Sequence, residues 1–568
     1  MKKMPAFLLS ILLGMALLSA FAFPAASAGD ITDQATAAFD GQGKLRLVPV
    51  MPEGLTPEVT ESEAFQRILG ISPDGKTILG IITEKETVVI EPKESAEDQQ
   101  EEDVSVIHSD DRNNERRKKK ATSGEQGPRE VEKKTDRFCL IRDGELIPVL
   151  ENAEKGDGDP YGNLEKLTEQ MMYLPGTEGL SWSADGRYIT FSNVRMQSDQ
   201  SGYSIRPMNV PVVDTASGEI WLADSYIHNN LLISEYGRVI LSRMSRDGAY
   251  VYYLAHRNVD GEQYYCFCRC TPDGKNREIL CRTQSNGLEM PFRPLSTSNL
   301  FENPDGSWVM LGTDQPVTES DKKAYSVMVS FTPSGDSWTA EVRSTGIPSS
   351  IDPVSFAWSP VSGYGLILLD YSDLRLLSGH ADSVYIPKRE GRVIARHLRI
   401  IRIRPDAEDP FDVWYMNRTG ESPDEVELLS GESYLEYLQA CIDGQNDEKP
   451  SGLDADDGSA FDINFRTDPL IVSACISPDG RYALVKALTS DWEGDYSKGK
   501  TYCFYLIDLE TMAVIPVEAP EGIRTEVPPQ ESWYGSQYRL DMFWNADGTV
   551  FIPGEKEDDV FFRLAVQQ

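Results

Sequence analysis

An all-β fold is predicted by this sequence, chiefly because one short hairpin turn recurs along most of the chain. The turn reads Ser or Asn, any residue, Asp, Gly, and it begins at residues 72, 183, 245, 303, 477 and 545. In the copy Ser477-Pro478-Asp479-Gly480, the proline fixes φ at the first corner, the aspartate tolerates the second, and the glycine takes the positive φ that follows. Apolar runs at residues 470–476 and 482–487 flank it, as expected for a hairpin between two half-buried strands.

The spacing of the turns predicts a repeat architecture. A degenerate copy at residues 359–363 lacks the aspartate, and with it the turns start 111, 62, 58, 56, 118 and 68 residues apart. Three intervals lie between 56 and 62, and the two longest fit one unit plus an insertion. One supersecondary unit at a near-constant period is typical of a repeat fold, and four short strands per unit form a propeller blade. We therefore expect a β-propeller with seven blades of four antiparallel strands; six or eight blades are the alternatives.

The segment at residues 44–50 is expected to close the ring. It resembles residues 145–150 and 512–517, which end the first and sixth repeats, yet it precedes any first strand. The last repeat has three strands and ends near Val566. Pairing of residues 44–50 beside residues 561–564 would complete that repeat and cover an open sheet edge.

The other strands are apolar runs between successive turns. In the first repeat, strands flank Asp74 and a third follows at residues 138–141. In the later repeats we expect strands within residues 182–193, 211–214, 239–256, 266–281, 299–312, 325–331, 338–342, 356–370, 398–403, 411–415, 470–487, 502–508, 514–517, 541–544, 549–552 and 560–566. We therefore expect residues 44–568 to form a single propeller domain.

Three segments interrupt this pattern. Residues 93–136 are dense in charge and poor in apolar side chains, so we expect a disordered insertion. Its basic run at residues 116–120 could bind a polyanion, but a solvated tether is the favoured interpretation. The connectors at residues 153–178 and 418–469 are each expected to hold a short helix, the second at residues 433–442 before Gly444.

The N-terminus predicts export. Residues 1–28 combine Lys2 and Lys3 with a short apolar run and the small residues Ala26-Ser27-Ala28, which indicates a signal peptide cleaved after Ala28. An uncleaved membrane anchor is the alternative. Residues 29–43 are polar, and we expect them to be loose. No second apolar run reaches the ~20 residues that span a bilayer, so the expected protein is secreted or extracytoplasmic, without a membrane span.

Charge and cysteine usage exclude some classes of partner and cofactor. The formal net charge is −36, and it becomes −38 once Lys2 and Lys3 are removed. Such a surface repels nucleic acid, so no nucleic-acid partner is expected, and it favours a soluble monomer. Cys266, Cys268 and Cys270 alternate along one strand, with Cys281 across the turn. Buried thiols are expected here, with a cross-strand disulfide or a metal site as alternatives; no metal site or cofactor is predicted.

Loop lengths predict where a partner binds. In an antiparallel blade, the turns between strands one and two and between strands three and four lie on one face. All the long segments instead join strands two and three or join successive blades, so they gather on the opposite face, which we call the long-loop face. Exposed aromatic residues suit a peptide or a sugar ring. The candidate binding residues on this face are Trp492, Tyr496, Trp533, Tyr534 and Tyr538; packing of these rings against the scaffold is the alternative.

The repeat resembles a known family. The turn Ser477-Pro478-Asp479-Gly480 followed by the strand at residues 503–508 is similar to the TolB-like, WD-type propeller repeat, and residues 212–219 resemble its second half. The resemblance covers about residues 44–568. It implies a propeller in which the turn aspartates are structural, namely Asp74, Asp185, Asp247, Asp305, Asp479 and Asp547. It implies no particular function, because such propellers have many roles. The sialidase turn differs, since Gly186 comes one residue too early for it.

Two functions follow from these observations. The first is a secreted or cell-surface protein that binds a protein, peptide or glycan without catalysis. The second is an extracellular propeller enzyme, a lyase or hydrolase acting on polysaccharide or peptide. The sequence lacks a Gly-x-Ser-x-Gly nucleophile motif, and no two of its five histidines lie closer than 17 residues. No catalytic residue is therefore predicted and binding is favoured, while the identity of the ligand stays open.

Overall fold

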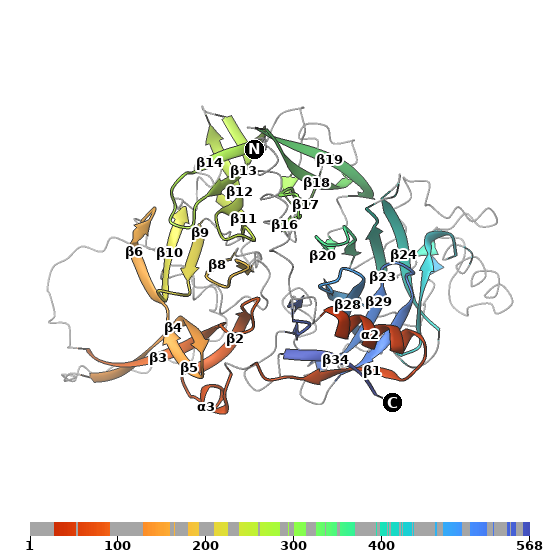
Figure 1. Ribbon diagram of the computed structural model, residues 1–568, viewed down its shortest axis with the longest axis horizontal. Helices are drawn as coiled ribbons and strands as arrows, with labels where there is room; N and C mark the ends of the chain where they lie inside the picture. Colours follow the sequence, from red (N-terminus) through yellow and green to blue (C-terminus); the bar gives the residue numbers. More distant parts are fainter. Residues whose placement is uncertain are drawn as a thin grey trace, which may run out of the picture.

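The structure, a computed structural model, consists mainly of antiparallel sheets that follow one another around a ring, as in a β-propeller (Figure 1). It describes residues 28–52, 55–90, 129–158, 164, 180–191, 209–224, 238–259, 262–284, 293–294, 300–313, 325–335, 337–348, 353–369, 393–394, 398–405, 407, 410–419, 422, 424–433, 436, 461–462, 470–490, 500–519, 526–527, 542–545, 547–552 and 561–567. None of the helices in these ranges is both long and apolar enough to cross a membrane.

Several sheets have the four-stranded antiparallel order that the repeat predicts. Two sheets consist of β2 (Phe65–Ile71), β3 (Ile78–Ile90), β4 (Arg129–Arg142) and β5 (Glu145–Pro148), and of β11 (Arg238–Met244), β12 (Val251–Val259), β13 (Glu262–Cys270) and β14 (Glu278–Gln284). In each of them the strands pair in chain order, so one repeat supplies one sheet.

Three further sheets add a fifth strand to such a unit. They consist of β6 (Leu150–Gly156), β7 (Ser181–Trp182), β8 (Tyr188–Thr190), β9 (Val210–Asp214) and β10 (Glu219–Asp224); of β15 (Arg293–Pro294), β16 (Leu300–Glu302), β17 (Trp308–Thr313), β18 (Tyr325–Ser334) and β19 (Ser337–Pro348); and of β20 (Pro353–Trp358), β21 (Gly365–Leu369), β23 (Leu398–Ile403), β24 (Phe411–Arg418) and β25 (Val426–Ser430). Strand β6 pairs in parallel with β10. The chain that leaves the β2–β5 sheet therefore first forms the edge strand of the next sheet.

The largest sheet joins the two ends of the chain. Its strands are β27 (Leu470–Ile476), β28 (Tyr482–Ser490), β29 (Lys500–Asp508), β30 (Val514–Glu518), β1 (Lys44–Pro49), β34 (Phe561–Gln567), β33 (Val550–Phe551) and β32 (Phe543–Trp544), with β31 (Glu526–Val527) beside β29. A separate parallel pair is formed by β22 (Val393–Ile394) and β26 (Phe461–Asp462).

The pairing predicted for the N-terminal strand is confirmed. Strand β1 pairs antiparallel with β34, with Leu45 opposite Val566 and Leu47 opposite Leu564. It also pairs in parallel with β30, where Leu45 lies opposite Val517. Leu45 and Leu47 are both buried in a core shared with β28, β29 and β34. Strand β1 therefore links the last two units, as the lower part of Figure 1 shows.

The sheets are buried on both faces. In β3, Leu79 and Ile81 pack against the sheet of β7–β10, whereas Ile78 and Ile82 pack against Phe551 and Phe561 on the other side. Successive side chains of a strand point to opposite faces, so a strand between two neighbouring sheets must be apolar throughout. This explains why the inner strands read as continuous apolar runs in the sequence.

The segment expected to be loose at residues 29–43 is instead mostly helix α2 (Ala28–Phe39). Ile31, Ala35 and Ala38 recur at helical spacing, and all three are buried. Gly41 ends the helix: its N–H donates to Ala38 O and the Gln42 N–H donates to Ala37 O, which is a Schellman motif. The expectation was wrong because the mean polarity of the segment hid this narrow apolar stripe.

The charged insertion is shorter than predicted. Residues 129–136 were expected to be disordered but belong to β4, which pairs with β3 as far as Ile90 opposite Arg129. Cross-strand contacts explain this extension, because Thr83 donates to Asp136 and Arg137 forms an ion pair with Glu84 at 2.7 Å. The rest of the predicted insertion, residues 93–128, lies outside the described residues.

The two helical connectors are described only in part. Of the first, residues 153–156 belong to β6, and Leu164 is helical and buried in the core between neighbouring sheets. The second begins with β25, an extra strand beside β24. Residues 431–433 and 436 are helical, and the remainder of the expected helix lies outside the described residues. A short helix α3 (Pro57–Thr60) precedes β2.

Removing β1 should destabilise the protein strongly. A chain that starts at Thr56 loses the buried Leu45 and Leu47, each worth about 1.5–3 kcal/mol, together with the ladder to β34. We expect a loss of several kcal/mol in the free energy of unfolding, measured by chemical denaturation. An unchanged denaturation midpoint and an unchanged solubility would show that the pairing of β1 with β34 is not what closes the ring.

Deleting the part of the insertion between β3 and β4 should leave the fold intact. Residues 93–127 lie beyond the paired ends Ile90 and Arg129, so a short glycine-serine linker can replace them. The melting temperature should stay within a few degrees of that of the full chain. A large decrease would mean that the insertion packs on the propeller.

Candidate functional site

The recurrent turn is held by the same polar contacts in the four copies that begin with serine. In the first copy, Ser72 Oγ donates to Asp74 Oδ1 at 2.6 Å, and Asp74 Oδ1 accepts the N–H of Lys76 at 3.1 Å. Ser72 Oγ in turn accepts the N–H of Thr77 at 2.9 Å. The copies that begin at Ser183, Ser245 and Ser477 repeat these contacts. The carboxylates are therefore used to shape the turns, as the resemblance implies.

Neighbouring turns pack directly on one another. A Cβ on Gly248 would lie 3.1 Å from Cβ of Ser183, and its φ of +70° already favours glycine. The backbone N–H of Ala184 donates to Arg246 O of the next turn at 2.9 Å. Ser362 Oγ, in the degenerate copy, donates to Gly480 O at 2.8 Å. These contacts join short turns of neighbouring units into a lining on one face of the ring.

An arginine after the turn glycine reinforces two of the copies. Arg187 pairs with buried Asp214 at 3.6 Å, and Arg481 pairs with buried Asp508 at 3.0 Å. The hydrogen bond to Asp508, the largest cause, raises the pKa of Arg481. Because the two pairs occupy equivalent positions, this contact belongs to the repeat, and it ties the first turn of a unit to the end of its third strand.

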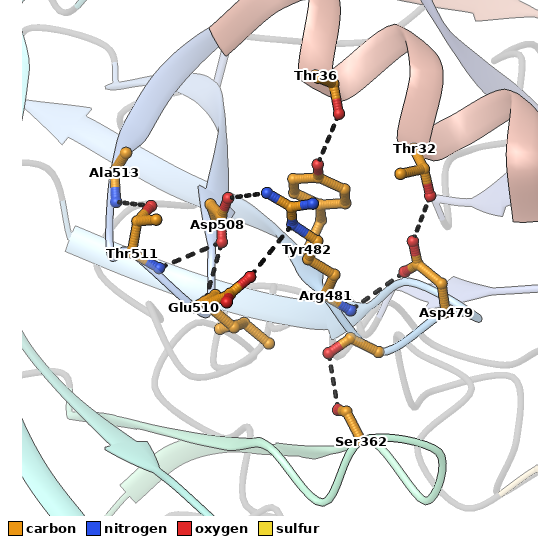
Figure 2. A network of polar contacts seen from close by, with 12 residues as sticks. Thr32, Thr36, Ser362, Asp479, Arg481, Tyr482, Asp508, Glu510, Thr511 and Ala513 are labelled. Atoms are coloured by element: carbon orange, nitrogen blue, oxygen red, sulfur yellow. Dashed lines mark hydrogen bonds and ion pairs between the residues drawn. The ribbon is translucent and has the colours of Figure 1, made fainter.

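The turn of β27 and β28 differs from the other copies because α2 rests on it. Figure 2 shows Thr32 and Thr36 pointing from the helix towards this turn. Thr32 Oγ1 donates to Asp479 Oδ2 at 2.6 Å, and Thr36 Oγ1 lies 3.2 Å from the Tyr482 hydroxyl. Phe39 stacks on the Tyr482 ring with centroids 6.0 Å apart. This polar network is a joint between the N-terminal helix and the repeat.

Buried polar groups elsewhere also tie sheets together. Arg402 forms an ion pair with Asp412 at 2.5 Å and donates to Leu509 O of the neighbouring unit at 2.8 Å. Tyr253 donates to buried Asp224 at 2.7 Å, and Arg277 lies 3.7 Å from the same carboxylate. Each group has a partner in the adjacent sheet, so these contacts resemble structural joints more than catalytic sets.

The cysteines lie on opposite faces of the β11–β14 sheet. Cys266, Cys268 and Cys270 are buried in the core with Trp221. Cys281 packs in the core on the other side of the sheet, and burial raises its pKa. Consequently, no disulfide joins Cys281 to the other three. Among the described residues, no group of three or more His, Cys, Asp or Glu side chains is arranged to hold a metal ion.

The residues of the predicted aromatic site belong to connections between strands. Trp492, Tyr496, Trp533, Tyr534 and Tyr538 all lie outside the described residues, so their grouping stays a prediction. The strand ends do give the lengths of the loops that bear them. The first turn of a unit runs from residue 477 to 481 in the β27–β30 unit, whereas the connection of β28 to β29 runs from 491 to 499.

The same contrast holds in other units. β3 and β4 are separated by residues 91–128 and β21 and β23 by residues 370–397, while β4 and β5 are separated only by Asp143 and Gly144. An exception is the connection of β12 to β13, which consists of residues 260–261. The longest connections thus leave the sheets at the long-loop face, opposite the lining of short turns.

Sequence reasoning missed two features of the face that bears the short turns, which we call the turn face. The helix α2 was hidden by its polar composition. The second was the use of Arg187 and Arg481 as partners of Asp214 and Asp508. A signal for it was present, because both arginines directly follow a turn glycine and both aspartates end a strand.

Comparison with known proteins gives similarity in structure alone. No family model matches the sequence, and no curated protein does. Similar solved structures include a polysaccharide lyase (10% identity, 67% of this chain and 77% of the other, TM-score 0.32) and a puromycin hydrolase (10% identity, 85% and 58%, TM-score 0.32). Another is the WD40 domain of SCAP from fission yeast (10% identity, 68% and 84%, TM-score 0.25). At these identities and TM-scores, the similarity assigns no activity to this chain.

Glu302 provides a test of how tightly neighbouring units are packed. Its Oε2 accepts the N–H of Arg246 at 2.6 Å, and burial raises its pKa. A raised pKa means that the folded state favours the protonated acid. The stabilisation by the protonated acid is therefore full below the ordinary value of about 4.3 and is lost as the pH rises through the folded pKa.

The variant Glu302→Gln keeps an acceptor for Arg246 without the buried charge. It should raise the melting temperature at pH 7, and the gain should shrink as the pH falls towards 4. Thermal scans from pH 3.5 to 8 measure this difference. A gain that is independent of pH would contradict the assignment.

Proposed function

We propose that this protein is a secreted or cell-surface binding protein of the TolB-like, WD-type propeller class. It binds a protein, peptide or glycan partner on the long-loop face and catalyses no reaction. The observation that carries the proposal is the contrast between the two ends of the sheets. One end is filled by short turns that are hydrogen-bonded to one another, and the other bears the long connections. Variable loops on a rigid scaffold are the common place for recognition.

Seven blades fit the strand pairing best. The nine-stranded sheet divides into a unit of β27–β30 and a unit of β32–β34 completed by β1. With the five other multi-stranded sheets, this makes seven units around the ring. Each unit has one copy of the turn or its degenerate form between its first two strands, which supports counting units by their turns.

The binding contribution of the aromatic residues can be tested directly. The purified protein is first screened on glycan and peptide arrays. Trp492→Ala and Trp533→Ala should then weaken binding of any ligand found by about tenfold or more, the effect expected of an aromatic anchor. The melting temperature should hardly change. Lys76→Ala, a change on the turn face, is the matched control and should leave affinity unaltered.

A ligand that binds normally to both tryptophan variants but not to variants of the turn face would overturn the proposal. Cleavage of an array component would instead support the alternative, an extracellular lyase or hydrolase acting on polysaccharide or peptide. Mass spectrometry of the incubated ligands distinguishes the two outcomes.

A further inference from the structure

We propose that α2 is a releasable strap on the turn face: it leaves its seat beside β28 and β34 while β1 and the ring stay closed. This conformational device is independent of the ligand and of the long-loop face. It rests on three observations, namely the kind of contact that holds α2, the hinge that follows it and the way the turn beneath it is stabilised.

The contacts that hold α2 differ in kind from those that hold β1. Strand β1 exchanges backbone hydrogen bonds along six residue pairs with β34, from Lys44 opposite Gln567 to Pro49 opposite Phe562. The backbone hydrogen bonds of a helix close within the helix itself. Among the described residues, the polar contacts of α2 with the body of the protein include those of the Thr32, Gln34 and Thr36 side chains, and Gln34 accepts the Val566 N–H at 2.7 Å. Release of α2 therefore breaks no sheet ladder.

The hinge lies between Phe39 and Gly43. Gly41 has a φ of +73°, and a Cβ placed on it would meet nothing within 4 Å, so this corner is not packed against the body. Gly43 is packed, because a Cβ there would lie 2.4 Å from Gln567 O. The unpacked Gly41 thus lies on the side of the movable α2, and the packed Gly43 lies on the side of the fixed β1.

The turn beneath α2, at residues 477–481, is held by hydrogen bonds that do not involve the helix. Thr32 uses Oδ2 of Asp479, whereas Oδ1 accepts the hydrogen bonds that form the turn, from Ser477 Oγ and from the Arg481 N–H. The turns at Ser72 and Ser183 are built through Oδ1 in the same way. Departure of α2 would uncover Tyr482, which is 0% exposed, and loosen the core around Cys475 without dissolving the turn.

Hydrogen exchange of the full-length protein tests the strap. We expect the amides of residues 32–39 to exchange at least about 100-fold faster than those of β1, because local opening requires less free energy than global unfolding. In Ala35→Asp, a charge at a fully buried position of α2 should remove the protection of the helix. Protection of β1 and β34 should stay at the level of the unsubstituted protein. Asp33→Asn, on the exposed side of α2, is the matched control and should change neither.

Thiol labelling gives a second measure of the same opening. Burial raises the pKa of Cys475, which shares a core with Ile31 and Ala35, and it raises the pKa of Cys139 to about 12 in a core that α2 does not reach. Ala35→Asp should accelerate labelling of Cys475 by about tenfold or more, as expected for local opening, with Cys139 unchanged, as read by mass spectrometry of peptides.

Two results would overturn the proposal. One is equal exchange rates for α2 and β1 in the unsubstituted protein. The other is a parallel loss of protection in α2, β1 and β34 in Ala35→Asp, with both thiols exposed. Either result would show that α2 and β1 open as one unit, so that α2 is not released separately from the N-terminal strand.

Discussion

Burial of both faces of every sheet is the constraint on which this structure depends. Ile78 and Ile82 on one side of β3, and Leu79 and Ile81 on the other, need apolar neighbours in two directions. A row of such sheets leaves an uncovered face at each end unless it closes on itself. The ring satisfies this need, and the pairing of β1 with β34 fastens it by backbone hydrogen bonds between residues at opposite ends of the chain.

The recurrent turn solves a second problem, which is how to end the inner strands close to the axis. Space there is limited where neighbouring turns meet, as Gly248 meets Ser183 and Gly480 meets Ser362. A serine hydroxyl and an aspartate carboxylate satisfy the local N–H groups without recruiting other segments. The acidic residues of these turns thus have structural roles, and the long connections lie at the opposite ends of the strands.

The N-terminal segment combines two modes of attachment. Strand β1 is part of a sheet, whereas α2 is a short helix that buries a narrow apolar stripe. Its Thr32 and Thr36 contact the hairpin of β27 and β28, as Figure 2 shows. Stability need not be uniform across a structure, and one element can open locally at a lower free energy than the whole. In the proposed strap, this difference is used to uncover a buried tyrosine without opening the propeller.

The sequence by itself determined the all-β class, the repeat unit, the structural role of the turn aspartates and the partner of the N-terminal strand. These features depend on local patterns: turn chemistry at Asp479 and Gly480, alternation or continuity of apolar residues, and the missing fourth strand of the last repeat. The sequence also names candidate binding residues, among them Trp492 and Trp533, but it gives no arrangement for them, since they belong to long connections that carry no local pattern.

Only the tertiary structure decided that residues 28–39 form a helix, that β4 begins at Arg129 and that Cys281 faces away from Cys266. The physical reason is the same in all three cases: the conformation depends on a partner from a distant part of the chain or on the register of strand pairing. A polar segment becomes helix when Tyr482 and Val566 provide a seat for its few apolar and polar contacts, and a charged segment becomes strand when Glu84 and Thr83 lie opposite it. The face on which a cysteine packs is likewise set by register, which a bulge between Phe267 and Cys268 shifts.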